Sequence, residues 1–191
     1  MAGQLPPLKR YITTHDPATG KAVYSTAFPT TLEPDTSLPT LKLYSCFTTT
    51  GFPVDTSADA DLEAYRPNMA SMPSFDLPNG TVCRVTDFAP GTPPIMHRTV
   101  SIDFGVVLEG KVEAVLDGGE TRLLERGDVV VQRGTMHAWR NASETEVARM
   151  FFVLQPIRPI VVQGEELGVY VPVHELFPDG DVPVSTAVTE G

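Results

Sequence analysis

With 191 residues the chain is long enough for one domain with a sizeable core, and its 41% hydrophobic residues exclude a disordered chain. A formal net charge of −10 argues against nucleic acid and anionic membranes as partners, since both require basic patches. There is no apolar run of the ~18 residues that a membrane span needs and no signal-peptide core, and two cysteines do not make a disulfide framework. We therefore expect a cytoplasmic protein whose partner is a small molecule.

Residues 1–80 are predicted to form an N-terminal extension of short strands and a proline-rich loop, packed on the main domain or on a partner subunit. Strand-like runs separated by turn-forming residues lie at 11–14, 22–27 and 41–49. The acidic segment 55–65 predicts a turn or two of helix with Ser57 as its cap. The three prolines of 67–79 predict an irregular segment, which is either a surface connector or a lid over the domain.

From residue 81 onward the pattern is that of closely spaced strands. Short apolar or alternating runs bounded by glycine-containing turns lie at 81–88, 98–109, 111–117, 120–125, 128–133, 137–141 and 147–155, with further runs at 160–162 and 169–173. This spacing is typical of an all-β protein built as a small antiparallel barrel or sandwich, with few short helices. The barrel domain is expected to span 81–175, and the polar segment 176–191 is expected to be a C-terminal tail.

One predicted strand carries a polar stripe backed by an apolar stripe. His97, Thr99, Ser101 and Asp103 share one parity, whereas Val100, Ile102 and Phe104 share the other. Residues of one parity project from one face of a strand. We expect the polar face to line a cavity and the apolar face to be covered by other structure.

The stretch around this strand resembles the first sequence motif of the cupin superfamily. Gly91, His97 and Gly110 fall at the motif's positions. Thr99 stands where the family has a second histidine, and Asp103 stands where it has a glutamate. One of the family's four usual metal ligands is therefore replaced by a residue that does not normally bind metal.

The second cupin motif is matched further along the chain. Gly134, His137 and Asn141 occupy its positions, and Gln132 replaces its proline. The chain resembles small single-domain cupins of microbial and fungal secondary-metabolite pathways, including polyketide pathways. The resemblance implies a jelly-roll β-barrel, and it implies a homodimer in which N-terminal strands reach the partner.

The cupin topology would bring His97, Asp103 and His137 together, and two interpretations of this group remain open. As metal ligands they would form a two-histidine, one-carboxylate site suited to Fe, Zn, Mn or Ni. Without metal they would form an acid–base site, in which an ionised Asp103 would keep one imidazole protonated. Both interpretations make the same three residues catalytic.

Four neighbouring side chains are predicted to contact the substrate. Thr99 and Ser101 share the polar face, and Trp139 has the parity of His137 and would supply a flat apolar wall. Arg133 is a candidate for binding a carboxylate or enolate. The resemblance implies a lyase or isomerase of polyketide-type secondary metabolism that performs dehydration, decarboxylation or double-bond isomerisation. The alternatives are an Fe(II)-dependent dioxygenase and a non-catalytic binding protein.

Overall fold

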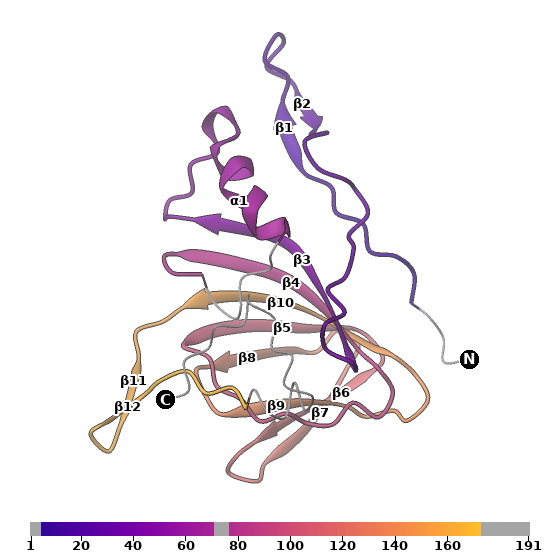
Figure 1. The fold of residues 1–191 in the computed structure, drawn as a ribbon, viewed down its shortest axis with the longest axis vertical. Helices are drawn as coiled ribbons and strands as arrows, with labels where there is room; N and C mark the ends of the chain where they lie inside the picture. The colour runs from indigo at the N-terminus through magenta and orange to yellow at the C-terminus, as the bar shows by residue number, and fades with distance from the viewer. Residues whose placement is uncertain (1–4, 71–76, 173–191) are drawn as a thin grey trace.

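Two β-sheets form the body of the protein, and two small hairpins project from it (Figure 1). The computed structural model describes residues 5–70 and 77–172. Its elements are β1 (Thr13–His15), β2 (Ala22–Tyr24), β3 (Leu41–Thr50), η1 (Ser57–Asp59), α1 (Ala60–Ala70), β4 (Gly80–Phe88), β5 (Ser101–Glu109), β6 (Lys111–Leu116), β7 (Thr121–Glu125), β8 (Val129–Arg133), β9 (His137–Asn141), β10 (Ala148–Pro156), β11 (Ile160–Val162) and β12 (Glu165–Leu167). The strands predicted between 81 and 162 are all present, with ends within a few residues of the predicted ones.

The larger sheet has five strands in the order β3-β4-β10-β5-β8, and every neighbouring pair is antiparallel. Successive side chains along each strand point alternately to the inner and the outer face of this sheet, because a strand has a period of two residues. Inner residues of β4, β5 and β10 meet residues of β6 and β9 in one core cluster, which includes Val82, Phe88, Val107, Val112, Met150 and Phe152. This core lies between the two sheets.

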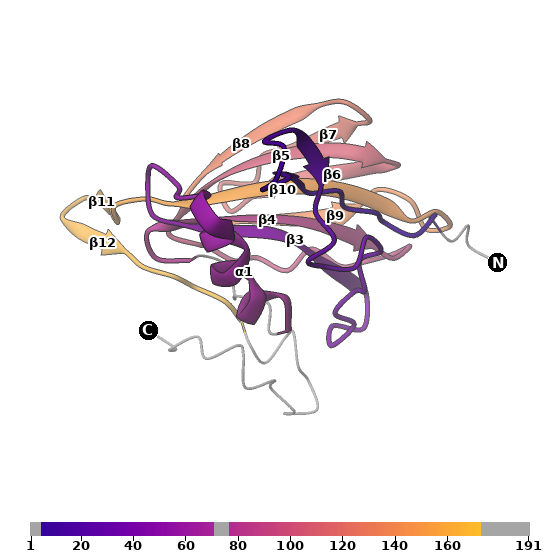
Figure 2. The ribbon, with the colours of Figure 1, turned by 90° about the horizontal axis from the view of Figure 1, so that it is seen from above.

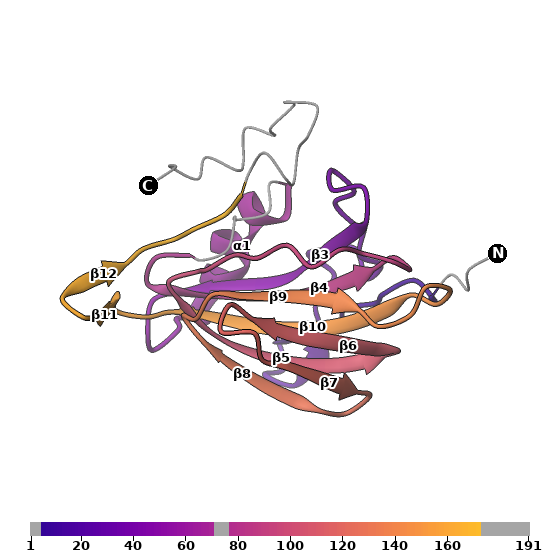
Figure 3. The same ribbon diagram turned by 90° about the horizontal axis from the view of Figure 1, so that it is seen from below.

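The smaller sheet, β7-β6-β9, faces the larger one, and Figure 3 shows it lying across β10 and β5. An antiparallel bridge between His97, just before β5, and His137, at the start of β9, connects the two sheets. The two sheets together give the jelly-roll arrangement that the strand spacing predicts.

One strand of the N-terminal extension belongs to the larger sheet, because β3 pairs with β4 from Leu41 to Thr50 with a single register shift between Ser45 and Phe47. Helix α1 packs on β3, as Figure 2 shows from above. Tyr65 of α1 is fully buried between Phe28 and Phe47, and its hydroxyl donates to the backbone oxygen of Ser45 at 3.0 Å. The hydrophobic contacts of Tyr65 therefore hold the helix against the sheet.

The sequence prediction for the segment after residue 55 was partly wrong. The helix runs from Ala60 to Ala70 and includes Pro67, which had been placed in an irregular segment. Ser57 is not a helix cap: its backbone N–H and its hydroxyl both donate to Asp55 Oδ1, at 2.9 and 2.5 Å. Tertiary packing of the helix outweighs the local cost of proline. Residues 71–76 of the segment proposed as a lid, and the whole C-terminal tail at 176–191, lie outside the described residues.

The chain after β10 is less regular than predicted. Residues 165–167 form β12, and in the 169–173 run the described part has an isolated bridge between Tyr170 and Arg98 in place of a strand. No helix in the described ranges is long and apolar enough to cross a membrane.

A buried ion pair lies on the outer face of the larger sheet. Arg149 Nε and Nη2 donate to the two carboxylate oxygens of Asp87 at 2.5 and 2.7 Å, and both side chains are less than a tenth exposed. Tyr44 donates to the same carboxylate, and Arg149 also donates to the backbone oxygen of Pro6 at 3.2 Å. The pair therefore links β4, β10 and the N-terminal segment.

We expect Asp87→Ala to lower the free energy of unfolding by about 3–5 kcal/mol, because it leaves the guanidinium of Arg149 buried without its counter-charge. Urea denaturation measures the change. Glu125→Ala is the matched control, since it breaks the exposed pair between Lys111 and Glu125 and should shift the midpoint far less. Equal shifts for the two variants would contradict a structural role for the buried pair.

The outer face of β5 and β8 carries an apolar surface. Phe104 and Val131 are register partners and are 40% and 49% exposed, and Val129 and Leu108 extend the surface. The β1–β2 hairpin does not cover this face, because it projects from the opposite end of the sheet (Figure 1). Tyr11 and Tyr24 stack edge to face on that hairpin and are also exposed. Such surfaces mark sites of association.

We propose that a second copy of the chain covers these apolar surfaces in a two-fold homodimer that buries more than ~1,200 Å² in total. Light scattering at micromolar concentration should give the dimer mass for the wild type. Val131→Lys should shift the mass toward that of the monomer, whereas Leu123→Lys, at an exposed site on β7, should not. A monomeric wild type would refute the proposal.

Candidate active site

Two histidines meet between the sheets. His97 and His137 exchange two backbone hydrogen bonds, with N···O distances of 2.8 and 2.9 Å. Paired residues of an antiparallel bridge send their side chains to the same face. The two imidazole rings accordingly lie with their centroids 4.3 Å apart and their planes 49° apart.

Burial keeps both imidazoles neutral near neutral pH. It lowers the pKa of His137 to about 3, with a further contribution from the adjacent His97, and it lowers the pKa of His97 below the usual histidine value. The physical cause is that a charged imidazolium loses its hydration between the sheets. Each ring can therefore act through its lone pair or its N–H group without first losing a proton.

Asp103 belongs to a separate row of polar groups. Ser101 Oγ lies 2.7 Å from Thr99 Oγ1 and 2.6 Å from Asp103 Oδ1, and all three side chains are buried. Burial raises the pKa of Asp103 to about 6, although the bond from Ser101 and the positive charge of Arg84 both act to lower it. The expectation that Asp103 keeps an imidazole protonated was therefore wrong, because burial lowers the pKa of both histidines. Asp103 itself, with a pKa of about 6, is still mostly ionised at neutral pH, as expected.

The predicted three-ligand metal site does not fit the arrangement of these residues. Within residues 5–70 and 77–172, no group of three or more His, Cys, Asp or Glu side chains is placed to hold a metal ion. His97 and His137 are adjacent, but Asp103 does not join them as a third ligand.

Of the residues predicted to contact the substrate, Trp139 lies at the histidine site and Arg133 does not. Trp139 packs against His137 with ring centroids 5.3 Å apart and against Phe152 at 5.6 Å, so its indole is part of the histidine site. Arg133 is not brought to the site: it is exposed, and its register partner Ile102 belongs to the outer face of the sheet. Strict alternation along β8 explains this, because Gln132 is the buried neighbour.

Sequence reasoning missed the charged residue of the barrel interior, Arg84. It is buried opposite Phe152 in the β4–β10 register, and its positive charge lowers the pKa of His97 as well as that of Asp103. Its parity could have revealed it in the sequence: Arg84 has the parity of the core residues Val82 and Phe88, and so points to the core side of its strand. A cation at a core position of a strand is costly unless it is paired and hydrogen-bonded, so a buried arginine on this face is a signal worth following.

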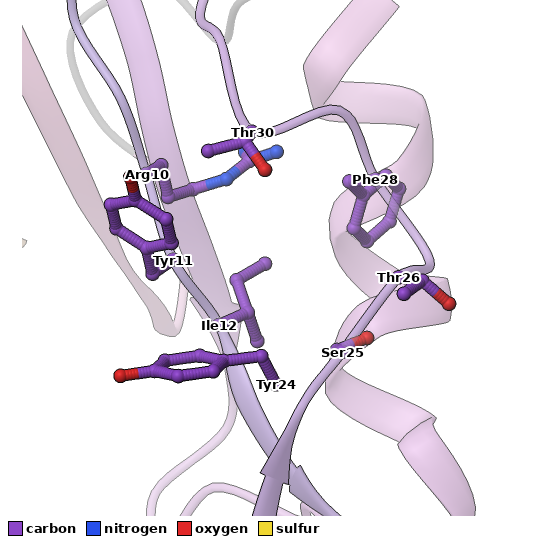
Figure 4. Close-up of a pocket in the computed structure, with 8 residues that line it drawn as sticks. All are labelled: Arg10, Tyr11, Ile12, Tyr24, Ser25, Thr26, Phe28 and Thr30. Carbon is purple, nitrogen blue, oxygen red and sulfur yellow. The ribbon is translucent and has the colours of Figure 1, made fainter.

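A separate hollow of about 350 Å³ lies in the N-terminal extension, away from the histidines (Figure 4). Its lining residues come from one short part of the chain and are Arg10, Tyr11, Ile12, Tyr24, Ser25, Thr26, Phe28 and Thr30. Arg10 beside it donates to the Tyr65 hydroxyl at 2.6 Å and to the backbone oxygen of Cys46 at 3.0 Å. Arg10 therefore holds the extension on α1 and β3, and the hollow contains none of the predicted catalytic residues.

Comparison with known proteins identifies the family. A family model described as Cupin domain matches residues 84–154. The chain is 42% identical to Oryzines biosynthesis cluster protein J of Aspergillus oryzae over 85% of this chain and 90% of that protein. It is 44% identical to Phomopsin biosynthesis cluster protein C' of Diaporthe leptostromiformis, over 83% of this chain and 84% of that protein. A third relative, at 43% identity over 60% of this chain and 57% of that protein, is the cupin-domain-containing oxidoreductase srdB of Neurospora crassa.

The chain belongs to the cupin family. Within it, the chain falls among the small cupins related to proteins of fungal secondary-metabolite clusters. The family and the jelly-roll fold predicted from the two motifs are thereby confirmed.

The raised pKa of Asp103 predicts a pH dependence of stability. The pKa is about 6 in the folded chain against 3.8 for an ordinary Asp, so between these values the folded state keeps a proton that the unfolded state has lost. The contribution of Asp103 to the free energy of unfolding should therefore fall by about 3 kcal/mol as pH rises through this window, at about 1.36 kcal/mol per unit, whereas the lowered pKa of His137 acts in the opposite direction over the same range. Asp103→Asn should lack this fall.

Urea denaturation at several pH values from 4 to 8 measures the difference between wild type and Asp103→Asn. Asp117→Asn, in the exposed turn between β6 and β7, controls for the loss of one negative charge. Parallel stability profiles for wild type and Asp103→Asn would show that Asp103 titrates like an exposed carboxyl.

Proposed function

We propose that the chain is an enzyme of secondary-metabolite biosynthesis that moves protons on a small oxygenated substrate, as a lyase or an isomerase. The observation that carries the proposal is the pair of adjacent, neutral imidazoles of His97 and His137. Relatives that cover most of the chain are biosynthesis cluster proteins for oryzines and phomopsin, which supports a role of this kind.

The histidine pair has the groups that enolisation needs. One imidazole takes a proton from carbon next to a carbonyl, and the N–H group of the other donates a hydrogen bond to the developing enolate oxygen. Return of the proton to another carbon isomerises a double bond, whereas its transfer to a leaving β-hydroxyl releases water. Loss of CO2 from a β-keto acid gives the same enolate, which then takes up a proton. None of these reactions requires an oxidant.

The surroundings of the pair favour a conjugated or aromatic substrate with negative charge. Trp139 supplies a flat apolar surface beside His137. The buried guanidinium of Arg84 supplies positive charge to the same interior, which stabilises an enolate or carboxylate. These features suit polyketide-type compounds, in which carbonyl groups and acidic C–H bonds alternate.

The second candidate function is an oxidoreductase. It is favoured by the names of relatives that match over about two thirds of this chain or less, including srdB and virC, both cupin-domain-containing oxidoreductases. Such a reaction changes the oxidation state of the substrate, whereas proton transfer does not. The products therefore distinguish the two functions.

The discriminating experiment uses metabolites that accumulate when the gene is disrupted in its source organism. Purified protein is incubated with them in D2O, in air and under argon, and products are identified by mass spectrometry. Loss of water or CO2, or deuterium uptake next to a carbonyl at equal rates with and without oxygen, supports the lyase or isomerase. Gain of oxygen or a change of two hydrogens supports the oxidoreductase, and binding without turnover supports a non-catalytic cupin.

We expect His97→Ala and His137→Ala each to lower kcat/KM by about 10²–10⁴-fold, the usual contribution of a positioned acid or base. His15→Ala is the control, because His15 is exposed on β1 and outside the site. Since burial lowers the pKa of His97 and His137, the wild-type rate should hold on acidification until the pH is below the ordinary histidine value of about 6.5. Full activity in both histidine variants would refute the proposal.

A further inference from the structure

The two imidazoles have different neighbours at Nδ1. His97 Nδ1 lies 2.9 Å from the backbone oxygen of Ile95, within the same chain segment. A carbonyl oxygen only accepts hydrogen bonds, so His97 Nδ1 carries a proton and donates it. The neutral ring of His97 therefore has its lone pair on Nε2.

His137 Nδ1 lies in a tight group with the Gln132 amide. Gln132 Nε2 is 2.7 Å from His137 Nδ1, and both nitrogens are 2.9 Å from the backbone oxygen of Thr135. Gln132 lies near the end of β8, His137 begins β9, and Thr135 lies in the turn between them. In this turn Gly134 adopts a φ of 60°, and its backbone N–H donates to Gln132 Oε1 at 2.9 Å. The left-handed turn at Gly134 thus folds the Gln132 amide back onto His137.

The backbone of this turn fixes which way the Gln132 amide points. In the observed orientation Oε1 accepts from Gly134 N–H and Nε2 donates to the oxygen of Thr135. Reversal would set oxygen against oxygen at 2.9 Å and N–H against N–H. Amide orientations are assigned from such networks, and only one orientation satisfies both backbone groups here.

The short distance between Gln132 Nε2 and His137 Nδ1 then fixes the ring proton. Two nitrogens 2.7 Å apart require a proton between them, and an amide NH2 group donates but does not accept. The oxygen of Thr135 competes for the same nitrogen, because at 2.9 Å it would accept from Nδ1 as the oxygen of Ile95 does at His97. The contact with Gln132 is the shorter of the two and cannot form if Nδ1 carries a proton, so we assign His137 Nδ1 as the acceptor and place the proton of its neutral ring on Nε2. His97 and His137 are opposite tautomers.

We infer that Gln132 is a positioning residue that holds His137 in the Nε2–H form, so that His97 is the base and His137 is the hydrogen-bond donor of the pair. The assignment of roles rests on the proposed function, whereas the two tautomers do not. In the reaction His97 Nε2 takes the proton from carbon and becomes an imidazolium. His137 keeps its proton and donates a hydrogen bond to the enolate oxygen, as a neutral imidazole can. His97 then delivers the proton to carbon or to the departing hydroxyl.

The same contact bears on the metal site predicted from the sequence. In the Nε2–H form His137 has no lone pair on Nε2, and its Nδ1 lone pair accepts from Gln132. A metal ligand needs such a lone pair. Gln132, which occupies the proline position of the second cupin motif, therefore makes His137 a hydrogen-bond donor instead of a ligand.

The test is a nitrogen–proton NMR spectrum of the histidine rings in 15N-labelled protein near neutral pH. The chain has four histidines, and His97→Gln and His137→Gln assign the two that matter. We expect the wild type to show a protonated Nδ1 on His97 and a protonated Nε2 on His137. A protonated Nδ1 on wild-type His137 overturns the inference, and this measurement depends on no variant of Gln132.

Gln132→Met removes the amide while keeping a side chain of similar length. The oxygen of Thr135 then remains as the neighbour of His137 Nδ1, so the ring proton should move to Nδ1. Gln155→Met, at an exposed position on β10, should leave both tautomers unchanged. An unaltered His137 signal in folded Gln132→Met would show that Gln132 does not set the tautomer.

Activity separates the inference from the proposed function. If both are correct, Gln132→Met should lower kcat by about 10²–10³-fold with little change in KM, as for loss of one donor to a developing oxyanion. Opposite tautomers in a wild type that exchanges no deuterium would refute the proposed function and leave the assignment of His137 standing. Deuterium exchange in a wild type whose two histidines are the same tautomer would support the proposed function and refute the assignment of His137.

Discussion

The two backbone hydrogen bonds between His97 and His137 are the constraint around which the site is built. They join the segment before β5 to the first residue of β9 and so connect the larger sheet to the smaller one. Because paired residues of an antiparallel bridge present their side chains on one face, the bridge forces the imidazoles together. Trp139, two residues further along β9, meets the same interior by the alternation of the strand.

Low polarity between the sheets determines how these groups behave. A buried imidazole is driven toward its neutral form, and so is a buried carboxyl, which is why the pKa values of His137 and Asp103 move in opposite directions. The charge of Arg84 opposes this effect at Asp103 but does not cancel it. A neutral histidine pair beside one buried cation favours reactions in which negative charge appears on a substrate oxygen.

The sequence determined most of the barrel and the identity of its two histidines. Strand alternation and glycine turns are local signals, so β4 to β10 could be placed to within a few residues. The family motifs placed His97 and His137 in register because the jelly roll fixes their relation. Local signals failed at α1, where Pro67 argued for a break but the burial of Leu62 and Tyr65 on β3 holds a helix.

Only the tertiary structure decided which polar residues act together. Asp103 and Gln132 are far apart in sequence but are register partners across β5 and β8. Because neighbouring residues of β8 point to opposite faces of the sheet, Gln132 points inward and Arg133 points outward. The tautomer of His137 depends on a turn geometry and on contacts of 2.7 and 2.9 Å, whose lengths differ by tenths of an ångström. Residue spacing carries no such information, because hydrogen bonding and desolvation depend on neighbours that the folded chain brings together.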